Sequence, residues 1–356
     1  MSSGNEDLLT ATARRMFSDL CEPRAINRAA DDAWQAPAWA ALEDAGLTLA
    51  WVPDDLGGAG GAIADGFAVV REAGRVAAAL PVPETLLAGW LLARAGLMSP
   101  KGPMSCGPVR EGDEVVLSPS GLLSGRLRAL PFALGARHIA LLARREGAGD
   151  VVALIAASAA RVAAGNNVAG EARNGVELSG VRPLAVKPAP PELDARALRL
   201  LGAALRATQM TGALEAVLAL AVAYANERVA FGRPIAKFQA VQHNLARLAG
   251  EVAAAIAASG SAAEAIATSA RFDDAVLLEV AAAKIRVGEA AGEGAGIAHQ
   301  VLGAIGFTRE HWLHRFTRRL WAWRDDFGNE STWAVTLGGL VAARGADELW
   351  PMLAAR

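Results

Sequence analysis

The stretch ERVAFGRPIAKFQAVQHNLA, residues 227–246, interrupts a long apolar helix and decides how the rest of the chain is interpreted. The preceding residues 196–228 predict one helix that is apolar nearly all round. Such a helix is buried on several sides, inside a bundle or at a subunit interface. Pro234 suits the first turn of the next helix, because its missing N–H would be unpaired there anyway. The next helix then has an apolar stripe formed by Phe238, Val241, Leu245 and Leu248.

Working outward, composition divides the chain into three zones. Residues 1–112 predict helices, two of which are separated by Pro81 and Pro83. Residues 113–188 alternate between apolar and polar side chains and are interrupted by Gly, Pro and Ser. This pattern predicts a small β-domain. The proline-rich linker VKPAPPELD leads into a third zone, taken as residues 189–356, that predicts helices throughout. The expected fold is α+β, with helices first, then a small sheet, then a helical bundle.

Composition and charge argue against several classes of protein. Hydrophobic residues make up 53% and charged residues 20%, which is typical of a core-rich globular protein rather than a disordered one. A net charge of -2 gives no sign of the concentrated basic face that binds nucleic acid. Arg, Glu and Gly interrupt the alanine-rich stretches, so no membrane span is expected, and the N-terminus has no apolar signal segment. Cys21 and Cys106 lie far apart without CxxC spacing, which fits a reducing cytoplasm.

Several segments together carry a family resemblance. The segment AYANERVAFGRPIAKFQAVQHNLARLAGEV (223–252) is similar to the pattern Y-x-x-x-R-x-x-F-G-x-x-[IL]-x-x-x-Q, and HQVLGAIGFTREHWLHRFTRR (299–319) is similar to Q-x-x-G-G-x-G followed by R-x-x-R-D. WAALEDAGLTLAWVPDDLGGAGG (39–61) looks like the N-terminal helical domain of the same family. The chain resembles the acyl-CoA dehydrogenase family of FAD-dependent flavoproteins. The resemblance implies a C-terminal four-helix bundle behind the small middle β-domain.

The resemblance also implies which residues bind FAD. In this family, the arginine at the end of the long helix reaches the pyrophosphate of an FAD held mainly by the neighbouring subunit, and Arg228 matches it. A guanidinium fork suits phosphate oxygens, and glycine lets the backbone approach a cofactor closely. The other matching positions are Phe231, Gly232, Gln239, Gln300 and Gly303.

The catalytic base is where the chain departs most from the family. The reaction removes a proton α to the thioester while flavin N5 takes a hydride from the β carbon, and the family uses a glutamate as the base, because burial can tune a carboxylate toward neutrality. One family position for that glutamate falls at Gly202, and the other at Phe327 or Gly328 in WRDDFGNES. Glu330 is the nearest glutamate and is the candidate base, with Asp325 and Asp326 as neighbours. A carboxylate just before the last helix also suits the helix dipole without any catalytic role.

Other departures concern the flavin ring and one charge. Neither a T-E-P-x-x-G-S-D stretch nor a W-I-[TS]-N stretch is present in the middle zone, so flavin contact from that domain is in doubt. Ala304 replaces the second glycine of Q-x-x-G-G, and Arg319 replaces the aspartate of R-D. His311 and His314 lie three apart but have no cysteine nearby, so no metal site is expected.

Two hypotheses for the function stay open. In the first, the chain is an FAD-dependent acyl-CoA dehydrogenase with Glu330 or a neighbour as base, and electrons pass to an electron-transfer flavoprotein. In the second, it is a subunit without its own base that binds FAD at a shared interface and supports an active partner chain. A homodimer, a tetramer or a heteromer with a second acyl-CoA dehydrogenase subunit is expected, because the FAD residues act across a subunit boundary.

Overall fold

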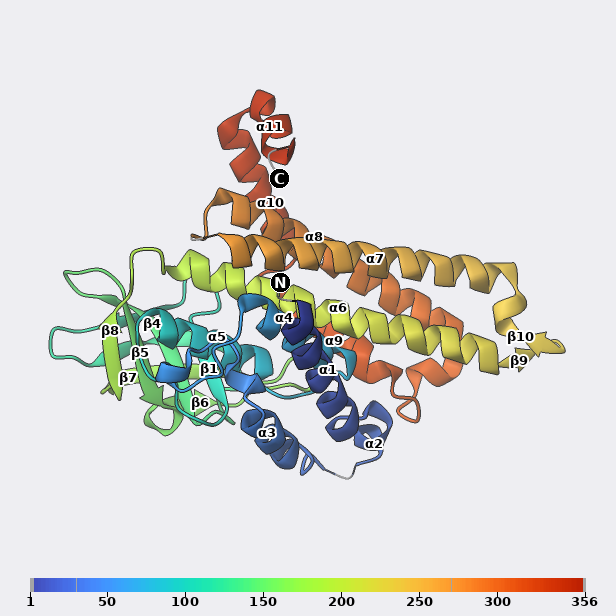
Figure 1. The fold of residues 1–356 in the computed structure, drawn as a ribbon, viewed down its shortest axis with the longest axis horizontal. Coiled ribbons are helices and arrows are strands. Elements are labelled where there is room, and N and C mark those ends of the chain that lie inside the picture. Colours follow the sequence, from blue (N-terminus) through green and yellow to red (C-terminus); the bar gives the residue numbers. More distant parts are fainter. Residues whose placement is uncertain (1–2, 30, 270, 355–356) are drawn as a thin grey trace.

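The computed structural model describes residues 3–29, 31–269 and 271–354. The chain has a helical N-terminal region, a β-sheet layer and a long helical bundle that extends away from the sheet (Figure 1). The N-terminal helices are α1 (Ser3–Leu20), α2 (Pro23–Arg28), α3 (Gln35–Asp44), α4 (Ile63–Arg75) and α5 (Val82–Arg94), with two 3-10 turns, η1 (Leu47–Leu49) and η2 (Asp54–Leu56), between α3 and α4. Pro81 and Pro83 mark the start of α5, as the sequence predicts, because proline fits the first turn of a helix.

The sheet has eight strands among the described residues, with the order β6-β7-β3-β2-β4-β5-β8, and β1 pairs in parallel with β4. The strands are β1 (Met104–Gly107), β2 (Glu114–Leu117), β3 (Leu123–Pro131), β4 (His138–Arg145), β5 (Val151–Ala156), β6 (Arg161–Ala163), β7 (Arg173–Val181) and β8 (Ala185–Pro188), with the 3-10 turn η3 (Ala157–Ala159) between β5 and β6. β1 lies before the predicted domain boundary at residue 112, so the sheet begins earlier in the chain than the composition suggests.

The bundle is built on α6 (Ala195–Glu227), which packs against α7 (Gln239–Thr268) and α8 (Asp274–Leu302). α9 (Leu313–Asp325) and α10 (Glu330–Arg344) complete it, and α11 (Leu349–Ala354) follows the 3-10 turn η6 (Ala346–Glu348). Asp194 caps the start of α6 by accepting a hydrogen bond from the Ala197 N–H at 2.8 Å. The predicted α+β order and the four-helix character of the third zone are both confirmed.

The interruption at residues 227–246 is longer than the sequence predicts. A short hairpin, β9 (Val229–Ala230) and β10 (Arg233–Pro234), follows α6, and a 3-10 turn, η4 (Ile235–Lys237), precedes α7. The prediction that Pro234 opens the second helix is wrong, because Pro234 pairs in the hairpin and α7 begins at Gln239. Of the predicted stripe, Leu248 is fully buried, whereas Phe238, Val241 and Leu245 are half-buried.

α6 also bears on the membrane question. The sequence predicts no apolar run long enough to span a bilayer, yet α6 passes that test by length and composition. More than half of its most apolar window, 56%, is buried inside the structure, which is what a core helix of a bundle also shows.

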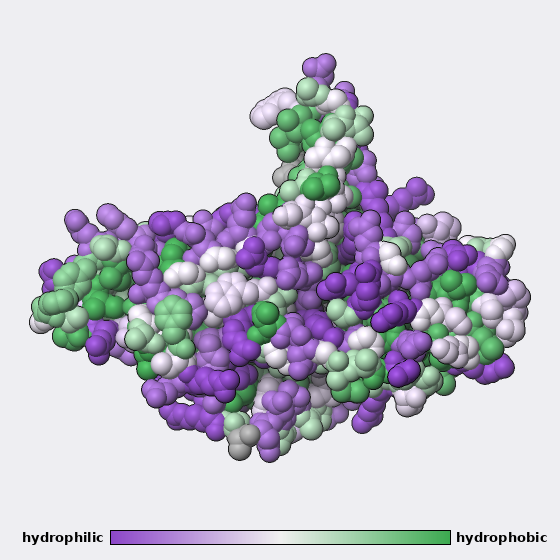
Figure 2. Space-filling view, turned by 180° about the vertical axis from the view of Figure 1, so that it is seen from behind, coloured by the Kyte–Doolittle hydropathy of each residue, from purple (hydrophilic) through white to green (hydrophobic). Residues whose placement is uncertain are grey.

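The last helices project from the body of the molecule (Figure 1). In the view from behind, this projection carries hydrophobic side chains on its surface (Figure 2). Val335 on α10 is 76% exposed, and Trp350 on α11 is 75% exposed.

Candidate functional site

Two parts of the structure carry the residues that the sequence singles out, and the first is the far end of the bundle. α6 and α7 are joined by the hairpin and α7 and α8 by a short link, so α6 and α8 run in the same direction. Their C-terminal ends and the start of α7 therefore lie together, at the end of the bundle away from the sheet (Figure 1). This arrangement brings to one end all six predicted cofactor-binding residues: Arg228, Phe231, Gly232, Gln239, Gln300 and Gly303.

These residues are open to solvent. Phe231 is 95% exposed, and Arg228, Gln239 and Gln300 are also exposed. Phe231 and Gly232 have φ of 51° and 79°, a left-handed turn that presents the backbone outward, and a Cβ on Gly232 would meet open space. Arg228 has no ion-pair partner in the described part of the chain, so its guanidinium is available for a phosphate. The set is thus accessible, as an FAD contact requires, and its role in binding FAD stays a prediction.

The second part is the junction of α6, the sheet and the loop after α9, where the family places its base. The family positions for the base are Gly202 on α6 and Phe327 or Gly328 in the loop, and Gly202 is in direct contact with Phe327. A Cβ built on Gly202 would lie 2.2 Å from Cε1 of Phe327, so the ring rests on the bare backbone of α6. Phe327 itself has a φ of 58° and is followed by Gly328 at 99°, a turn that directs this ring toward α6. Neither position carries a carboxylate.

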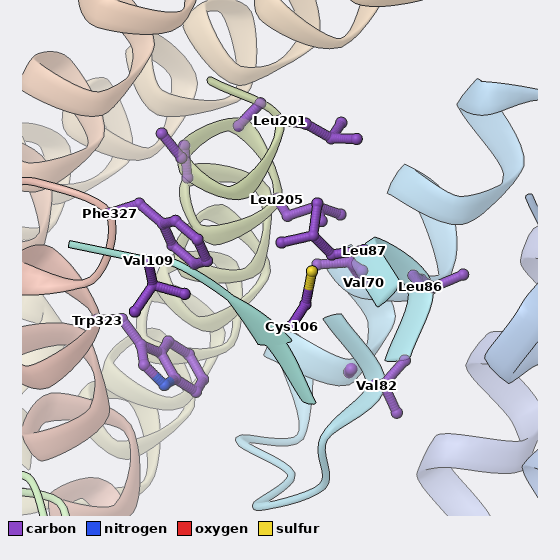
Figure 3. Close-up of a cluster of buried hydrophobic side chains, with 14 of the residues drawn as sticks. Val70, Val82, Leu86, Leu87, Cys106, Val109, Leu201, Leu205, Trp323 and Phe327 are labelled. Atoms are coloured by element: carbon purple, nitrogen blue, oxygen red, sulfur yellow. The ribbon is translucent and has the colours of Figure 1, made fainter. Parts of the chain in front are cut away.

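Apolar side chains surround this contact. Phe327 is 7% exposed and Trp323 is 1% exposed. Figure 3 draws both rings in one buried cluster with side chains from α5, α6 and the β1 segment, namely Leu86, Leu87, Cys106, Val109, Leu201 and Leu205. On the side facing α5 and α6, the contact is thus packed with hydrocarbon, while Phe327 also borders a cavity.

Asp326, one residue before Phe327, belongs to a buried ionic cluster. Its carboxylate accepts a hydrogen bond from Arg173 Nη2 at 2.5 Å and lies 3.1 Å from Arg206 Nε. Arg206 Nη2 also reaches Glu84 on α5 at 2.5 Å. Burial raises the pKa of the Asp326 carboxyl, but Arg173 and Arg206 outweigh burial and hold the pKa below its usual range. Asp326 is therefore ionised and fully engaged, since two guanidiniums occupy its oxygens.

The reversed charge at Arg319 is balanced in the same cluster. Arg319 Nε donates to Glu171 Oε1 at 2.8 Å, and the indole N–H of Trp323 donates to Glu171 Oε2 at 2.9 Å. Burial alone would raise the pKa of Glu171, but Arg319 and Arg173 lower it below its usual range. Arg319, which replaces the family aspartate, therefore has an acidic partner in the loop between β6 and β7.

Glu330, the candidate base, lies on the other side of this loop, at the first position of α10. Its Oε1 accepts from Arg324 Nε at 2.6 Å, and it packs so closely on α8 that a Cβ at Gly288 would lie 1.8 Å from Oε1. Next to it, the buried Lys284 Nζ donates to the carbonyl oxygens of Trp323 at 3.2 Å and Arg324 at 2.7 Å, which ties α8 to the end of α9. Glu330 faces α8 and Arg324, and its role as base stays a prediction.

A cavity of about 730 Å³ opens beside the loop, between the sheet and the start of α6. Asp325 and Phe327 line it together with Val109 and Pro131. Most of the arginines that line it are held by acids: Arg128 by Asp113, Arg173 by Asp326, and Arg199 by Glu111. Ion pairs between protein side chains thus make up much of the wall of this cavity.

The buried cluster was not predicted from the sequence, although one signal was available. Arg206 is the one charged residue between Arg199 and Glu215 in an apolar helix, and its 2% exposure requires a partner. Its partners are 122 and 120 positions away in the chain, at Glu84 and Asp326, so no local pattern names them. In the described residues, no group of three or more His, Cys, Asp or Glu could hold a metal ion.

The fold and the site define a three-part flavoprotein of helical, sheet and helical-bundle regions, and comparisons with known proteins are consistent with this. The model of the acyl-CoA dehydrogenase N-terminal domain matches residues 3–99, and that of the C-terminal domain matches residues 200–324. The chain belongs to the acyl-CoA dehydrogenase family, whose members are FAD-dependent oxidoreductases that act on acyl-CoA. The predictions of family, enzyme class and FAD as cofactor are confirmed at this level.

Individual relatives are similar over most of the chain. The acyl-CoA dehydrogenase IpdE2 of Mycobacterium tuberculosis is 30% identical over 88% of this chain and 89% of its own length. The acyl-CoA dehydrogenase FadE34 of the same organism is 32% identical over 89% of this chain, but the match spans 44% of FadE34. Among solved structures, the ChsE4-ChsE5 complex from Mycobacterium tuberculosis matches with a TM-score of 0.84 at 23% identity, covering 96% of this chain and 98% of that chain. A glutaryl-coenzyme A dehydrogenase in complex with glutaryl-CoA matches with a TM-score of 0.82 at 20% identity, covering 96% of each chain.

Proposed function

We propose that this chain is the subunit of a heteromeric acyl-CoA dehydrogenase that lacks its own catalytic base and completes the FAD site of a partner chain. The observation that carries the proposal is the contact between the Phe327 ring and Gly202. A proton-abstracting carboxylate has to lie within hydrogen-bond reach of the substrate carbon. At the two family positions for that carboxylate, this chain has an aromatic ring and a glycine in contact with each other.

The neighbouring carboxylates are engaged elsewhere. Asp326 is bound by Arg173 and Arg206, and Glu330 is bound by Arg324. Recruiting either one as a base would first break a partly or fully buried ion pair, and breaking such a pair is strongly destabilising.

The open end of the bundle supports the second half of the proposal. Arg228, Phe231, Gln239 and Gln300 form an exposed surface that fits an FAD pyrophosphate and its adenosine, with Arg228 binding phosphate oxygens. FAD supplies hydride acceptance when bound. This chain's own contribution is to hold and orient the phosphate end, while the partner chain supplies the base and the acyl pocket. Electrons would pass on to an electron-transfer flavoprotein.

The comparisons are in keeping with a two-chain assembly. The matched ChsE4-ChsE5 structure is described as a complex of two components. FadE34 is more than twice as long as the part that this chain matches, so it has room for a second unit of similar size in one polypeptide.

The visible absorption spectrum tests the proposal. The chain is expressed alone and together with a second acyl-CoA dehydrogenase chain, and each preparation is titrated anaerobically with a panel of acyl-CoAs. We expect the chain alone to be colourless, or yellow without bleaching, and the co-expressed complex to hold flavin that bleaches. A chain that binds flavin and bleaches alone overturns the proposal and favours a self-sufficient dehydrogenase.

Glu330→Gln separates the two hypotheses further. If the partner chain supplies the base, Glu330→Gln in the complex leaves the rate of bleaching unchanged. Loss of bleaching with flavin still bound would assign the base to Glu330, as the first hypothesis requires. Glu146→Gln, at an exposed glutamate in the turn after β4, is the matched control.

A further inference from the structure

A second cleft lies between the N-terminal helices, the loop after β3 and the first turns of α9. Two cavities of about 500 Å³ and 490 Å³ share Phe132 and Gly135 from the sheet and Asp32 and Gln35 from the N-terminal region, so they form one continuous cleft. One end is largely apolar, lined by Trp39, Leu80, Pro81 and Pro103. The other end is cationic, lined by Arg315, Arg318 and Arg319. The cleft is thus amphipathic along its length.

The cationic end consists of three guanidiniums on neighbouring turns of one helix. Arg315 and Arg319 are four residues apart on α9, a spacing that places like charges on the same face and destabilises the helix. Arg319 is compensated by Glu171 at 2.8 Å. Arg315 and Arg318 have no ion-pair partner in the described residues, and Arg318 Nε donates only to the carbonyl oxygen of Val168, at 2.8 Å. Two of the three charges therefore face the cleft without a counter-ion.

Arg315 also carries an unsatisfied donor. Its Nε is buried and has no hydrogen-bond partner in the described part of the chain, and a buried charged donor left unbonded is costly. Burial and the charge of Arg319 lower the pKa of Arg315 to about 10, so it stays protonated at neutral pH. The neighbouring thiol of Cys21 cannot balance it, because burial raises the pKa of Cys21 to about 12 and keeps it neutral.

The remaining groups around the cationic end do not neutralise the positive charge of Arg315 and Arg318. Asp32 lines the same cavity but makes no ion pair with Arg315, and Glu171 is already bound by Arg319 and Trp323. His314 also lines it, and burial lowers the pKa of that imidazole, so it adds little charge at neutral pH. At the apolar end, the indole N–H of Trp39 is a second buried donor without an acceptor among the described residues. Orphan donors thus occur at both ends of the cleft.

We propose that this cleft binds an organic oxyanion, with a phosphate or carboxylate head on Arg315 and Arg318 and an apolar body along Phe132, Leu80 and Trp39. Guanidiniums are the donors that bind both kinds of head in a forked geometry. An oxyanion supplies the acceptor that Arg315 Nε lacks and the negative charge that the turns of α9 lack. The site lies apart from the exposed end of the bundle and from the Phe327 contact, and the proposal does not depend on the function proposed above.

Isothermal titration calorimetry on the full chain tests the site, with three probes: octanoate for a carboxylate with an apolar tail, coenzyme A for organic phosphates, and inorganic phosphate for the head alone. All titrations are made at one ionic strength set with sodium chloride. We expect octanoate or coenzyme A to bind at one site per chain and more tightly than inorganic phosphate. The double variant Arg315→Gln, Arg318→Gln should bind the same organic anion at least about tenfold more weakly than the wild type, because two charge-assisted contacts are removed.

The control is Arg144→Gln, an exposed arginine near the end of β4 that pairs with Glu114 and lines neither cavity. It should bind the probes as the wild type does. If the double variant does not fold, Arg318→Gln alone serves, because Arg318 is exposed and makes one side-chain bond. The proposal is overturned if neither octanoate nor coenzyme A binds at the ionic strength set with sodium chloride. It is also overturned if the wild type and the Arg315 and Arg318 variants bind equally. Stronger binding of octanoate assigns a carboxylate ligand, and stronger binding of coenzyme A assigns a phosphorylated one.

Discussion

The junction around Asp326 and the end of the bundle around Arg228 place charge in opposite ways. At the junction, Asp326, Arg173 and Arg206 are mostly removed from water and form ion pairs with one another. At the bundle end, Arg228 and the glutamines are exposed and unsatisfied by the described chain. Charges removed from water must be paired, whereas exposed ones remain available for ligands. The comparison indicates that the charges of the junction stabilise the fold, while those of the bundle end remain available for the FAD contact that we propose.

The strongest test of this difference is to break the junction. Asp326→Asn leaves Arg173 and Arg206 facing each other with too little negative charge, so we expect a loss of about 3 to 5 kcal/mol in the free energy of unfolding. Urea denaturation followed by circular dichroism measures it. Asp325→Asn, on the neighbouring exposed residue, should change stability by less than about 0.5 kcal/mol. Equal effects of the two variants would mean that the cluster is not a stability element.

The same cluster governs the response to acid. The pKa of Asp326 is lowered in the folded chain, so its contribution is present at neutral pH and is lost as the pH falls below its unfolded value toward the folded one. Wild type and Asp326→Asn should therefore converge in stability in strong acid, and the convergence is measured on the same urea curves.

Lys284 gives the next largest effect, with the same direction of pH dependence but in an alkaline range. Burial lowers the pKa of Lys284 to about 8 despite Asp326 and Glu330, so the folded chain binds this proton less tightly than the unfolded chain does. Between about pH 8 and pH 10 the unfolded chain holds more protons, and stability should rise with pH by up to about 2 to 3 kcal/mol in total. Lys284→Met should lose this rise, measured as the difference between wild-type and variant unfolding energies at each pH. Lys237→Met, on an exposed lysine, should keep it.

The contact between Gly202 and Phe327 is testable by a double-mutant cycle. Gly202→Ala places a methyl group inside the Phe327 ring, and overpacking of this kind costs about 1 to 3 kcal/mol. In the background of Phe327→Ala the same substitution should cost little or be stabilising, because the ring is gone and alanine favours the helix. The coupling energy from thermal unfolding of the four proteins is the measurement. Additive effects would show that ring and helix do not touch.

How far the sequence could predict the two regions follows from how each is built. The bundle end is encoded in two continuous stretches, 223–252 and 299–319, whose residues meet because three helices run back and forth with short links. A local pattern is enough to find it. The junction depends on pairs such as Arg206 with Glu84 and Arg173 with Asp326, which come from different domains. The sequence itself shows that positions 202 and 327 carry no glutamate. It does not predict that the Phe327 ring lies on Gly202 or that Arg319 pairs with Glu171, because both contacts depend on how three regions of the chain pack together.

The hairpin shows the same limit on a smaller scale. The sequence locates the break after Arg228 correctly, yet Pro234 is assigned to a helix when it lies in β10. Proline is compatible with both a first helical turn and an edge strand, so local propensity does not decide between them. The left-handed turn at Phe231 and Gly232 closes the hairpin and selects the strand.

The smallest expected effect on the chain itself is at the bundle end, and it sharpens the comparison because stability and binding should separate there. Arg228→Gln removes an exposed charge with no partner in the described chain, so the free energy of unfolding should change by less than about 0.5 kcal/mol. In the complex with a partner chain, the same substitution should weaken FAD retention by about tenfold, because one charge-assisted contact to phosphate is lost. Flavin content after dialysis measures retention, and Lys237→Gln, another exposed cation of the same segment, is the control. Equal retention by wild type and Arg228→Gln would remove the bundle end from the FAD site, while a stability loss as large as that of Asp326→Asn would show that Arg228 is structural after all.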